Sequence, residues 1–168
     1  MISLASIAAA LRHGPWMLLA WVALMAFLFA KLEIQIEGPS GWAANLPTWR
    51  LPETSRLRRL FGNRDVTGYH VFAFAFMAVA FHLPLVLFGH FSLPLEARIL
   101  ASLAAFWILE DFLWFALNPA FGLARFKPQH VPWHPHWFLG VPVDYFVMSA
   151  LAIVLYAYSY GAFAPPSA

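Results

Sequence analysis

Four stretches of the chain are long and almost wholly apolar, and each supplies the roughly 20 residues that a helix needs to cross the hydrocarbon core of a bilayer. The stretches are residues 14–36, 69–89, 94–117 and 142–163. Thr67 is a candidate N-cap for the second helix, and Pro84 should kink that helix because proline donates no backbone hydrogen bond. Asn118 should end the third helix, since a residue before proline (here Pro119) avoids the helical conformation.

The composition agrees with this pattern and sets the class of protein. Hydrophobic residues make up 62% of the 168 residues and charged residues only 11%, with a mean hydropathy of +0.69. Soluble domains average about 45–50% apolar and about 25% charged residues, so the sequence predicts an all-α, polytopic integral membrane protein. We expect a single transmembrane domain over residues 1–168, built as a four-transmembrane-helix bundle. The net charge of only +2 argues against nucleic acid as a partner, and the absence of cysteine excludes disulfides and thiolate metal sites.

The basic residues predict the orientation, because cytoplasmic loops are enriched in lysine and arginine. Eight of the ten lie in or next to two long loops, and only two lie on the other side. The eight are Lys31, Arg50, Arg56, Arg58, Arg59, Arg64, Arg125 and Lys127; the two are Arg12 and Arg98. We therefore expect both long loops to be cytoplasmic and both termini to lie outside, in a cytoplasmic membrane such as the bacterial inner membrane. Residues 1–11 should form a short interfacial segment or extend the first helix.

Polar side chains from every predicted helix gather on the cytoplasmic half of this topology. Five of the eight acidic residues take part, together with one helical histidine and three histidines of the second loop. They are Glu33, Glu37, Glu110, Asp111, Asp144, His70, His130, His134 and His136. Intramembrane ionisable groups mark functional sites by default, so this convergence predicts a site.

Within this group, Glu110 and Asp111 are the strongest indication of a functional site. They lie roughly 10–12 Å inside the third helix at about 1.5 Å per residue, and an acid at a helix centre costs about 3 kcal/mol on insertion scales. Among the basic residues only Lys31 is expected to reach them, because the arginines belong to the loop. Because basic partners are scarce, we expect a metal ion or protonation of a carboxyl group to offset the buried negative charge. The simpler interpretation is a buried network that orients the helices.

Glu33 and Glu37 are four residues apart, which places them on one face of a helix. The stretch around them also alternates as a strand would, but an open strand edge is not tolerated in lipid, so we expect a helix. The alternative interpretation is that both are polar residues at a helix end that meets water.

The second loop holds three histidines within seven residues, at 130, 134 and 136. Prolines at 128, 132 and 135 exclude a helix there. Neutral imidazole binds iron, zinc and copper, so the cluster suggests metal ligation. The alternative is an interfacial belt in which the histidines, Trp133 and Trp137 lie at the level of the lipid headgroups.

These patterns predict an integral membrane metalloprotein, an enzyme that acts on a lipid-like or other hydrophobic substrate. A mixed carboxylate and histidine set suits non-haem iron, in preference to manganese or zinc. The expected metal ligands are Glu33, Glu37, His70, Glu110, His130, His134 and His136. Glu110 and Asp111 are the candidate catalytic groups, with Asp111 orienting a histidine or acting as acid or base. The expected substrate pocket contains Trp42, Trp49, Trp107, Trp114, Asn118 and Asp144.

Three alternatives use the same residues differently. A proton-linked transporter would use the acidic pair as a proton relay, and four helices would then require a homo-oligomer. A haem protein needs axial histidines on two facing helices, and the third and fourth spans contain none. A small subunit of a larger membrane complex would use the apolar surface to pack against a partner subunit and would leave the acidic pair unexplained.

Overall fold

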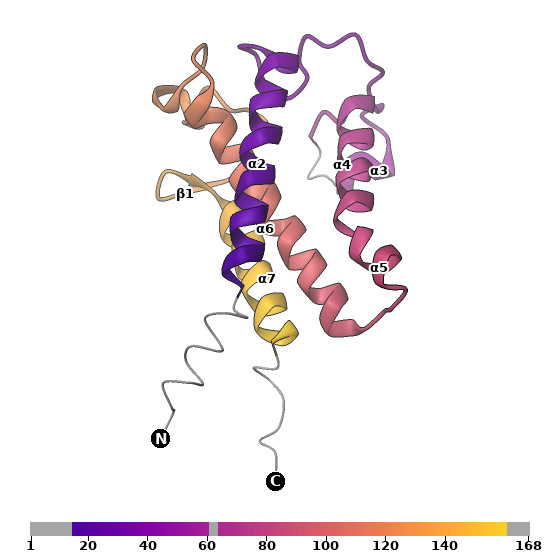
Figure 1. Cartoon of the computed structure of the whole chain (residues 1–168). Helices are drawn as coiled ribbons and strands as arrows, with labels where there is room; N and C mark the ends of the chain where they lie inside the picture. Colours follow the sequence, from indigo (N-terminus) through magenta and orange to yellow (C-terminus); the bar gives the residue numbers. More distant parts are fainter. Residues whose placement is uncertain (1–14, 61–63, 161–168) are drawn as a thin grey trace.

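The computed structural model describes residues 15–60 and 64–160, and these residues are mostly helical (Figure 1). The elements in chain order are α2 (Trp16–Glu37), α3 (Arg56–Leu60), α4 (Gly68–Phe81), α5 (Leu83–Phe88), α6 (Leu93–Leu117), the 3-10 turn η1 (Leu123–Arg125), β1 (Trp137–Phe138), β2 (Val141–Pro142) and α7 (Val143–Ser159). The strands β1 and β2 pair antiparallel in a small hairpin, which the all-α prediction did not include. The segment predicted for residues 1–11 lies outside the described residues.

Within the part of the chain that the structure describes, three helical segments are long and apolar enough to cross a membrane. They are Trp16–Glu37, Gly68–Phe88 (α4 with α5) and Leu93–Leu117, with mean hydropathies of 2.0, 2.3 and 1.7. The fourth span was predicted to cover residues 142–163. The corresponding helix, α7, has only 17 residues. At 1.5 Å per residue such a helix extends roughly 26 Å, slightly less than the roughly 30 Å of a hydrocarbon core.

Helix α6 lies at the centre of the arrangement and packs along α2 and α7, while α4 meets it over a shorter stretch. One buried cluster joins Val22 and Ala26 of α2 to Met77 of α4 and Phe106 of α6. Most large apolar side chains on the outer faces are exposed, as on α4, where Phe72 is 69% exposed. Apolar surface of this extent is what lipid would cover.

The helix ends follow the sequence signals. Thr67 caps α4: its hydroxyl accepts a hydrogen bond from the backbone N–H of His70, and the His70 ring accepts one from the backbone N–H of Thr67. Helix α6 ends at Asn118, whose extended conformation is the one expected before Pro119. The second apolar stretch is interrupted at His82, two residues before Pro84, so that α4 and α5 are separate helices.

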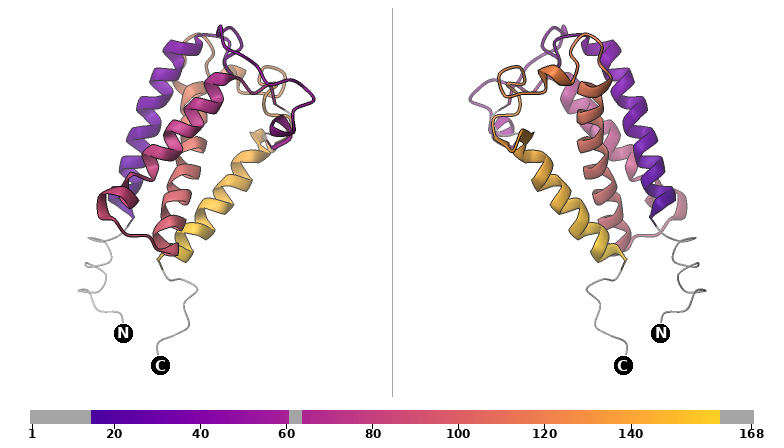
Figure 2. Two further views of the ribbon diagram at one scale, coloured as in Figure 1. Left: turned by 90° about the vertical axis from the view of Figure 1, so that its right-hand side faces the viewer. Right: turned by 90° about the vertical axis from the view of Figure 1, so that its left-hand side faces the viewer.

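The two long loops lie at one end of the bundle, and the turn between α5 and α6 lies at the other (Figure 1). Helix α7 diverges from α6 toward the loop end, as both views of Figure 2 show. Polar side chains of α2, α4, α6 and α7 line a pocket together with residues of the two loops.

Candidate functional site

A chamber of about 560 Å³ lies at the loop end of the helices. This is within the size range of small-molecule sites, roughly 300–1,000 Å³. Four helices and both long loops contribute to its wall. The lining residues are Glu33, Glu37, Trp42, Arg64, His70, Phe74, Trp107, Ile108, Glu110, Asp111, Trp114, Phe115, Trp133, His134, Asp144, Tyr145 and Met148. Its wall therefore combines aromatic surface with a concentration of ionisable groups.

Two carboxyl groups meet inside this chamber. The carboxyl groups of Glu33 of α2 and Glu110 of α6 lie within hydrogen-bonding reach of each other, and the hydroxyl of Tyr69 donates to Glu33 Oε1 at 2.7 Å. Glu110 is only 3% exposed, and its Oε1 atom is buried without a hydrogen-bond partner. Two carboxyl groups approach in this way only when a proton or a cation lies between them.

Glu37 ties the first loop to the end of α2. Its carboxylate accepts hydrogen bonds from the backbone N–H groups of Trp42 and Ala43, the latter at 2.5 Å. This contact turns the chain back over the helix end, and the ring of Trp42 becomes part of the chamber wall. The first loop thus covers the chamber.

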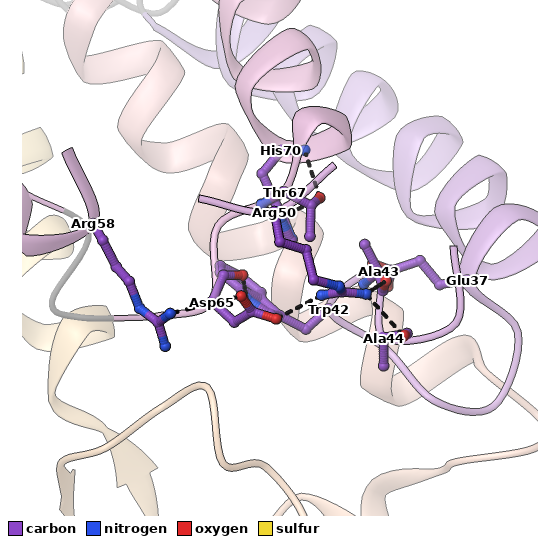
Figure 3. Close-up of polar contacts among 9 residues, drawn as sticks. All are labelled: Glu37, Trp42, Ala43, Ala44, Arg50, Arg58, Asp65, Thr67 and His70. Carbon is purple, nitrogen blue, oxygen red and sulfur yellow. Dashed lines mark hydrogen bonds and ion pairs between the residues drawn. The ribbon is translucent and has the colours of Figure 1, made fainter. Parts of the chain in front are cut away.

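The covering loop is held by Arg50, whose guanidinium donates to the backbone carbonyls of Ala43 and Ala44 and to Asp65 (Figure 3). The indole N–H of Trp42 donates to the backbone carbonyl of Asp65 at 2.7 Å. The Trp42 ring lies 4.1 Å from the His70 ring, centroid to centroid. These contacts hold the loop in one position over the helix ends.

His134 lies between two carboxylates. Its Nε2 atom is 3.0 Å from Asp111 of α6, and its Nδ1 atom is 3.2 Å from Asp144 of α7. The two acceptors match an imidazolium, which donates from both ring nitrogens. The hydroxyl of Tyr145 also donates to Asp111, and Arg64 forms an ion pair with Asp144. The result is a continuous polar chain from half-exposed Asp144 to Asp111 inside the chamber.

Carboxylates outnumber cationic side chains on the chamber wall. Five acidic residues line it, against one arginine and two histidines. Arg64 is engaged with Asp144; burial lowers the pKa of its guanidinium, and the negative charge of Asp111 opposes that shift. His70 is engaged in capping its own helix. Among the described residues of the wall, no cationic side chain therefore remains to pair with Glu33, Glu37 and Glu110.

Most of the residues predicted from the sequence line the chamber. Those that do are Glu33, Glu37, His70, Glu110, Asp111, His134 and Asp144, with Trp42, Trp107 and Trp114. His130 and His136 are exposed on the loop surface and do not line it. Trp49 lines a separate apolar groove beside α4, and Asn118 donates instead to the backbone carbonyl of Gly38 at 2.8 Å.

One sequence expectation about the cations is wrong. Lys31 was expected to reach the acids, but its side chain is exposed and does not line the chamber. Arg64 of the first loop lines the chamber instead and forms an ion pair with Asp144. The reason is the path of the loop, which returns over the helix ends and brings Arg64 against Asp144.

Sequence reasoning also missed two tyrosines and underrated one tryptophan. Tyr69 and Tyr145 donate to Glu33 and Asp111, and the only signal was that each stands next to a residue already singled out. Trp133, a member of the interfacial belt in the alternative interpretation, lines the chamber and stacks with Trp42 at a centroid distance of 6.4 Å.

Within residues 15–60 and 64–160, no three histidine or acidic side chains stand close enough together to hold a metal ion as placed. No protein-family model, curated protein or solved structure matches the chain. The geometry and chemistry of the chamber therefore carry the functional argument.

Proposed function

We propose that this protein is an integral membrane metalloenzyme that acts on a lipid-like or other hydrophobic substrate inside the chamber. In this proposal Glu33, Glu37 and Glu110 hold a divalent metal ion. His134, held by Asp111 and Asp144, acts as the acid–base group. The observation that carries the proposal is the contact between the carboxyl groups of Glu33 and Glu110 in a buried, carboxylate-rich wall.

The need for a positive charge supports the metal. A buried carboxylate is costly unless it is paired or coordinates a cation, and the cationic side chains on the wall are already engaged with other partners. Glutamate side chains are long enough to rotate, so the three carboxylates can converge on one ion. A carboxylate-rich set with an imidazole nearby suits iron, with manganese and zinc as less favoured ions. Such an ion supplies Lewis-acid or redox chemistry.

The position of the chamber supports a hydrophobic substrate. Its aromatic and aliphatic wall includes Phe74, Trp107, Ile108 and Met148, which belong to helices apolar enough to lie in a membrane. We propose that α7 completes a four-span bundle, that the two loops face the cytoplasm and that both termini lie outside. The excess of basic residues in and beside the loops supports this orientation. A membrane lipid, or a molecule dissolved in the membrane, would then enter sideways.

One observation favours a second candidate, a metal-free proton-linked carrier. The chain from Asp144 through His134 to Asp111 joins the surface to the buried acids, as a proton relay would. The outer half of the bundle offers less for such a pathway. The polar contacts there, such as that between His82 and Glu96, are local to the helix ends.

Metal analysis of the purified protein separates the two candidates. The protein is expressed in metal-replete cells, purified in mild detergent and analysed by mass spectrometry together with Glu110→Gln. The metalloenzyme proposal predicts a stoichiometric metal in the wild type that is lost in Glu110→Gln. Glu96→Gln is the matched control, because Glu96 is an acid of the same helix that pairs with His82 outside the chamber. A wild type without metal would refute the metalloenzyme proposal and favour the carrier.

A further inference from the structure

Among the described residues, three buried side-chain polar atoms have no hydrogen-bond partner, and all three belong to residues of the chamber wall. They are Oε1 of Glu110, Nε1 of Trp114 and Nε of Arg64. Buried polar groups in proteins are nearly always hydrogen-bonded, and leaving one unpaired costs about 1–3 kcal/mol. Their concentration around one chamber indicates that the missing partners belong to whatever occupies it.

Two of these atoms are N–H donors, which a metal ion cannot satisfy. An indole and a guanidinium donate hydrogen bonds and accept none. They require a ligand with acceptor atoms, in practice oxygen. Trp114 is 4% exposed, and its ring packs edge-on against Phe115 and Phe121 at centroid distances of 5.2 Å. Its donor is therefore held in a fixed place before a ligand arrives.

The charge of the wall limits what can carry that oxygen. Five acidic residues line the chamber, and the two cationic partners on its wall, Arg64 and His134, are already engaged with Asp144 and Asp111. An anionic headgroup such as a carboxylate or phosphate would place a further negative charge beside these acidic groups. A cationic ammonium headgroup would be attracted but offers no acceptor to the two donors. An uncharged carbonyl oxygen, as in a ketone, aldehyde or ester, accepts hydrogen bonds from the two donors and adds no negative charge.

The rest of the wall suits a hydrocarbon chain. Phe74 of α4, Met148 of α7, and Trp107 and Ile108 of α6 all line the chamber. Among the described helices, α7 diverges from α6 toward the loop end, as Figure 2 shows. A chain attached to the polar oxygen would leave the chamber here, into the lipid.

We propose that the chamber binds an uncharged, lipid-like molecule whose carbonyl-type oxygen accepts hydrogen bonds from Trp114 Nε1 and Arg64 Nε. This inference deepens the proposed function by naming its substrate class, and it rests on that function for the reaction that follows binding. The oxygen would lie on the wall that Glu110 also lines. There a Lewis-acidic ion would polarise it further.

The test is the indole N–H signal of Trp114 in protein labelled with nitrogen-15 at tryptophan and held in detergent micelles. Trp114→Phe assigns the signal, because it removes the donor and keeps an aromatic ring in the wall. The probes share one chain length: 2-tetradecanone, tetradecanoate and tetradecane. We expect the ketone to move the Trp114 proton downfield and tetradecane to leave it unmoved. We also expect ketone binding to be tighter than binding of tetradecanoate.

Two variants test the donors separately. Trp114→Phe and Arg64→Lys should each weaken ketone binding about two- to tenfold, the loss of one hydrogen bond. Lysine keeps the positive charge beside Asp144 but lacks the Nε donor. Trp49→Phe is the matched control, since Trp49 lies outside the chamber. The inference would be overturned if the ketone does not shift the Trp114 signal. It would also be overturned if tetradecanoate binds more tightly than the ketone.

Metal content measured on the same samples keeps the two proposals apart. A metal-free protein whose Trp114 signal still responds to the ketone would refute the metalloenzyme and leave the binding inference standing. A metal-loaded protein whose Trp114 signal does not respond to the ketone would refute the binding inference and leave the metalloenzyme proposal standing.

Discussion

The carboxyl groups of Glu33 on α2 and Glu110 on α6 lie within hydrogen-bonding reach of each other, although the two residues are far apart in the sequence. The contact joins the two helices at the depth where the chamber lies, and Tyr69 of α4 adds a third helix to it. Carboxyl groups are held in such a contact only by a shared proton or a cation. Chelation of a metal, or substitution of Glu110, should therefore change the stability of the protein.

Removal of metal should destabilise the wild type and leave Glu110→Gln unaffected. A ligand that binds only the folded state stabilises it by about 2.7 kcal/mol when its concentration is 100 times its Kd. A chelator should therefore lower the melting temperature of the wild type. The glutamine can still donate a hydrogen bond to Glu33, so we expect Glu110→Gln to fold and to melt at one temperature with or without chelator. Glu96→Gln should respond as the wild type does. Equal chelator sensitivity in all three proteins would contradict the assignment.

His134→Ala should lower stability much more than His136→Ala. His134 is 6% exposed and lies between Asp111 and Asp144, so its removal leaves two carboxylates without their partner. We expect a loss of about 1–3 kcal/mol, discounted for the partial exposure of both acids. His136 is exposed, and its replacement should change stability by less than about 0.5 kcal/mol. Denaturant or thermal melts in detergent measure both, and similar losses in the two variants would show that His134 carries no such network.

Gly41→Ala should displace the covering loop. Gly41 has a φ of +63°, and an added Cβ would lie 2.8 Å from the Trp133 ring and 2.9 Å from the Trp114 ring. Gly89 has a similar φ of +58° with nothing within 4 Å, so Gly89→Ala carries the backbone cost alone, about 1–2 kcal/mol. Overpacking should cost Gly41→Ala about 1–3 kcal/mol more. Melting temperatures and tryptophan emission report the difference, and equal effects would mean that the loop does not pack on these rings.

The orientation can be tested by cysteine labelling, because the chain contains no cysteine of its own. Glu53→Cys and Gln129→Cys place one thiol in each long loop, and His90→Cys places one in the turn between α5 and α6. All three residues are exposed. A membrane-impermeant maleimide applied to intact cells should label His90→Cys alone, and inverted vesicles should show the opposite pattern. Labelling of all three thiols from one side would refute the four-span topology.

The sequence predicted the helical parts of the site well, because periodicity, caps and prolines determine where helices begin and end. Glu33, Glu37, Glu110 and Asp111 were placed together from the spans and the distribution of basic residues alone. They line one chamber because α2 and α6 pack along each other with these residues at the same end.

The loop contributions to the site were harder to predict. Three histidines stand close together in the sequence, but only His134 turns inward, where Asp111 and Asp144 hold it. Arg64 reaches the chamber because the first loop returns over the helix ends. Such paths depend on long-range contacts, such as that between Arg50 and Asp65, and no local pattern of residues encodes them.

The most direct test of the central claim is manganese(II) binding followed by electron paramagnetic resonance. Protein stripped with chelator is titrated with manganese, and the loss of the sharp spectrum of the free ion counts the bound ions. The account predicts a tight site in the wild type and in Glu96→Gln that is absent in Glu110→Gln. A free-ion spectrum at every protein concentration, or equal binding in all three proteins, would contradict a metal site between Glu33 and Glu110.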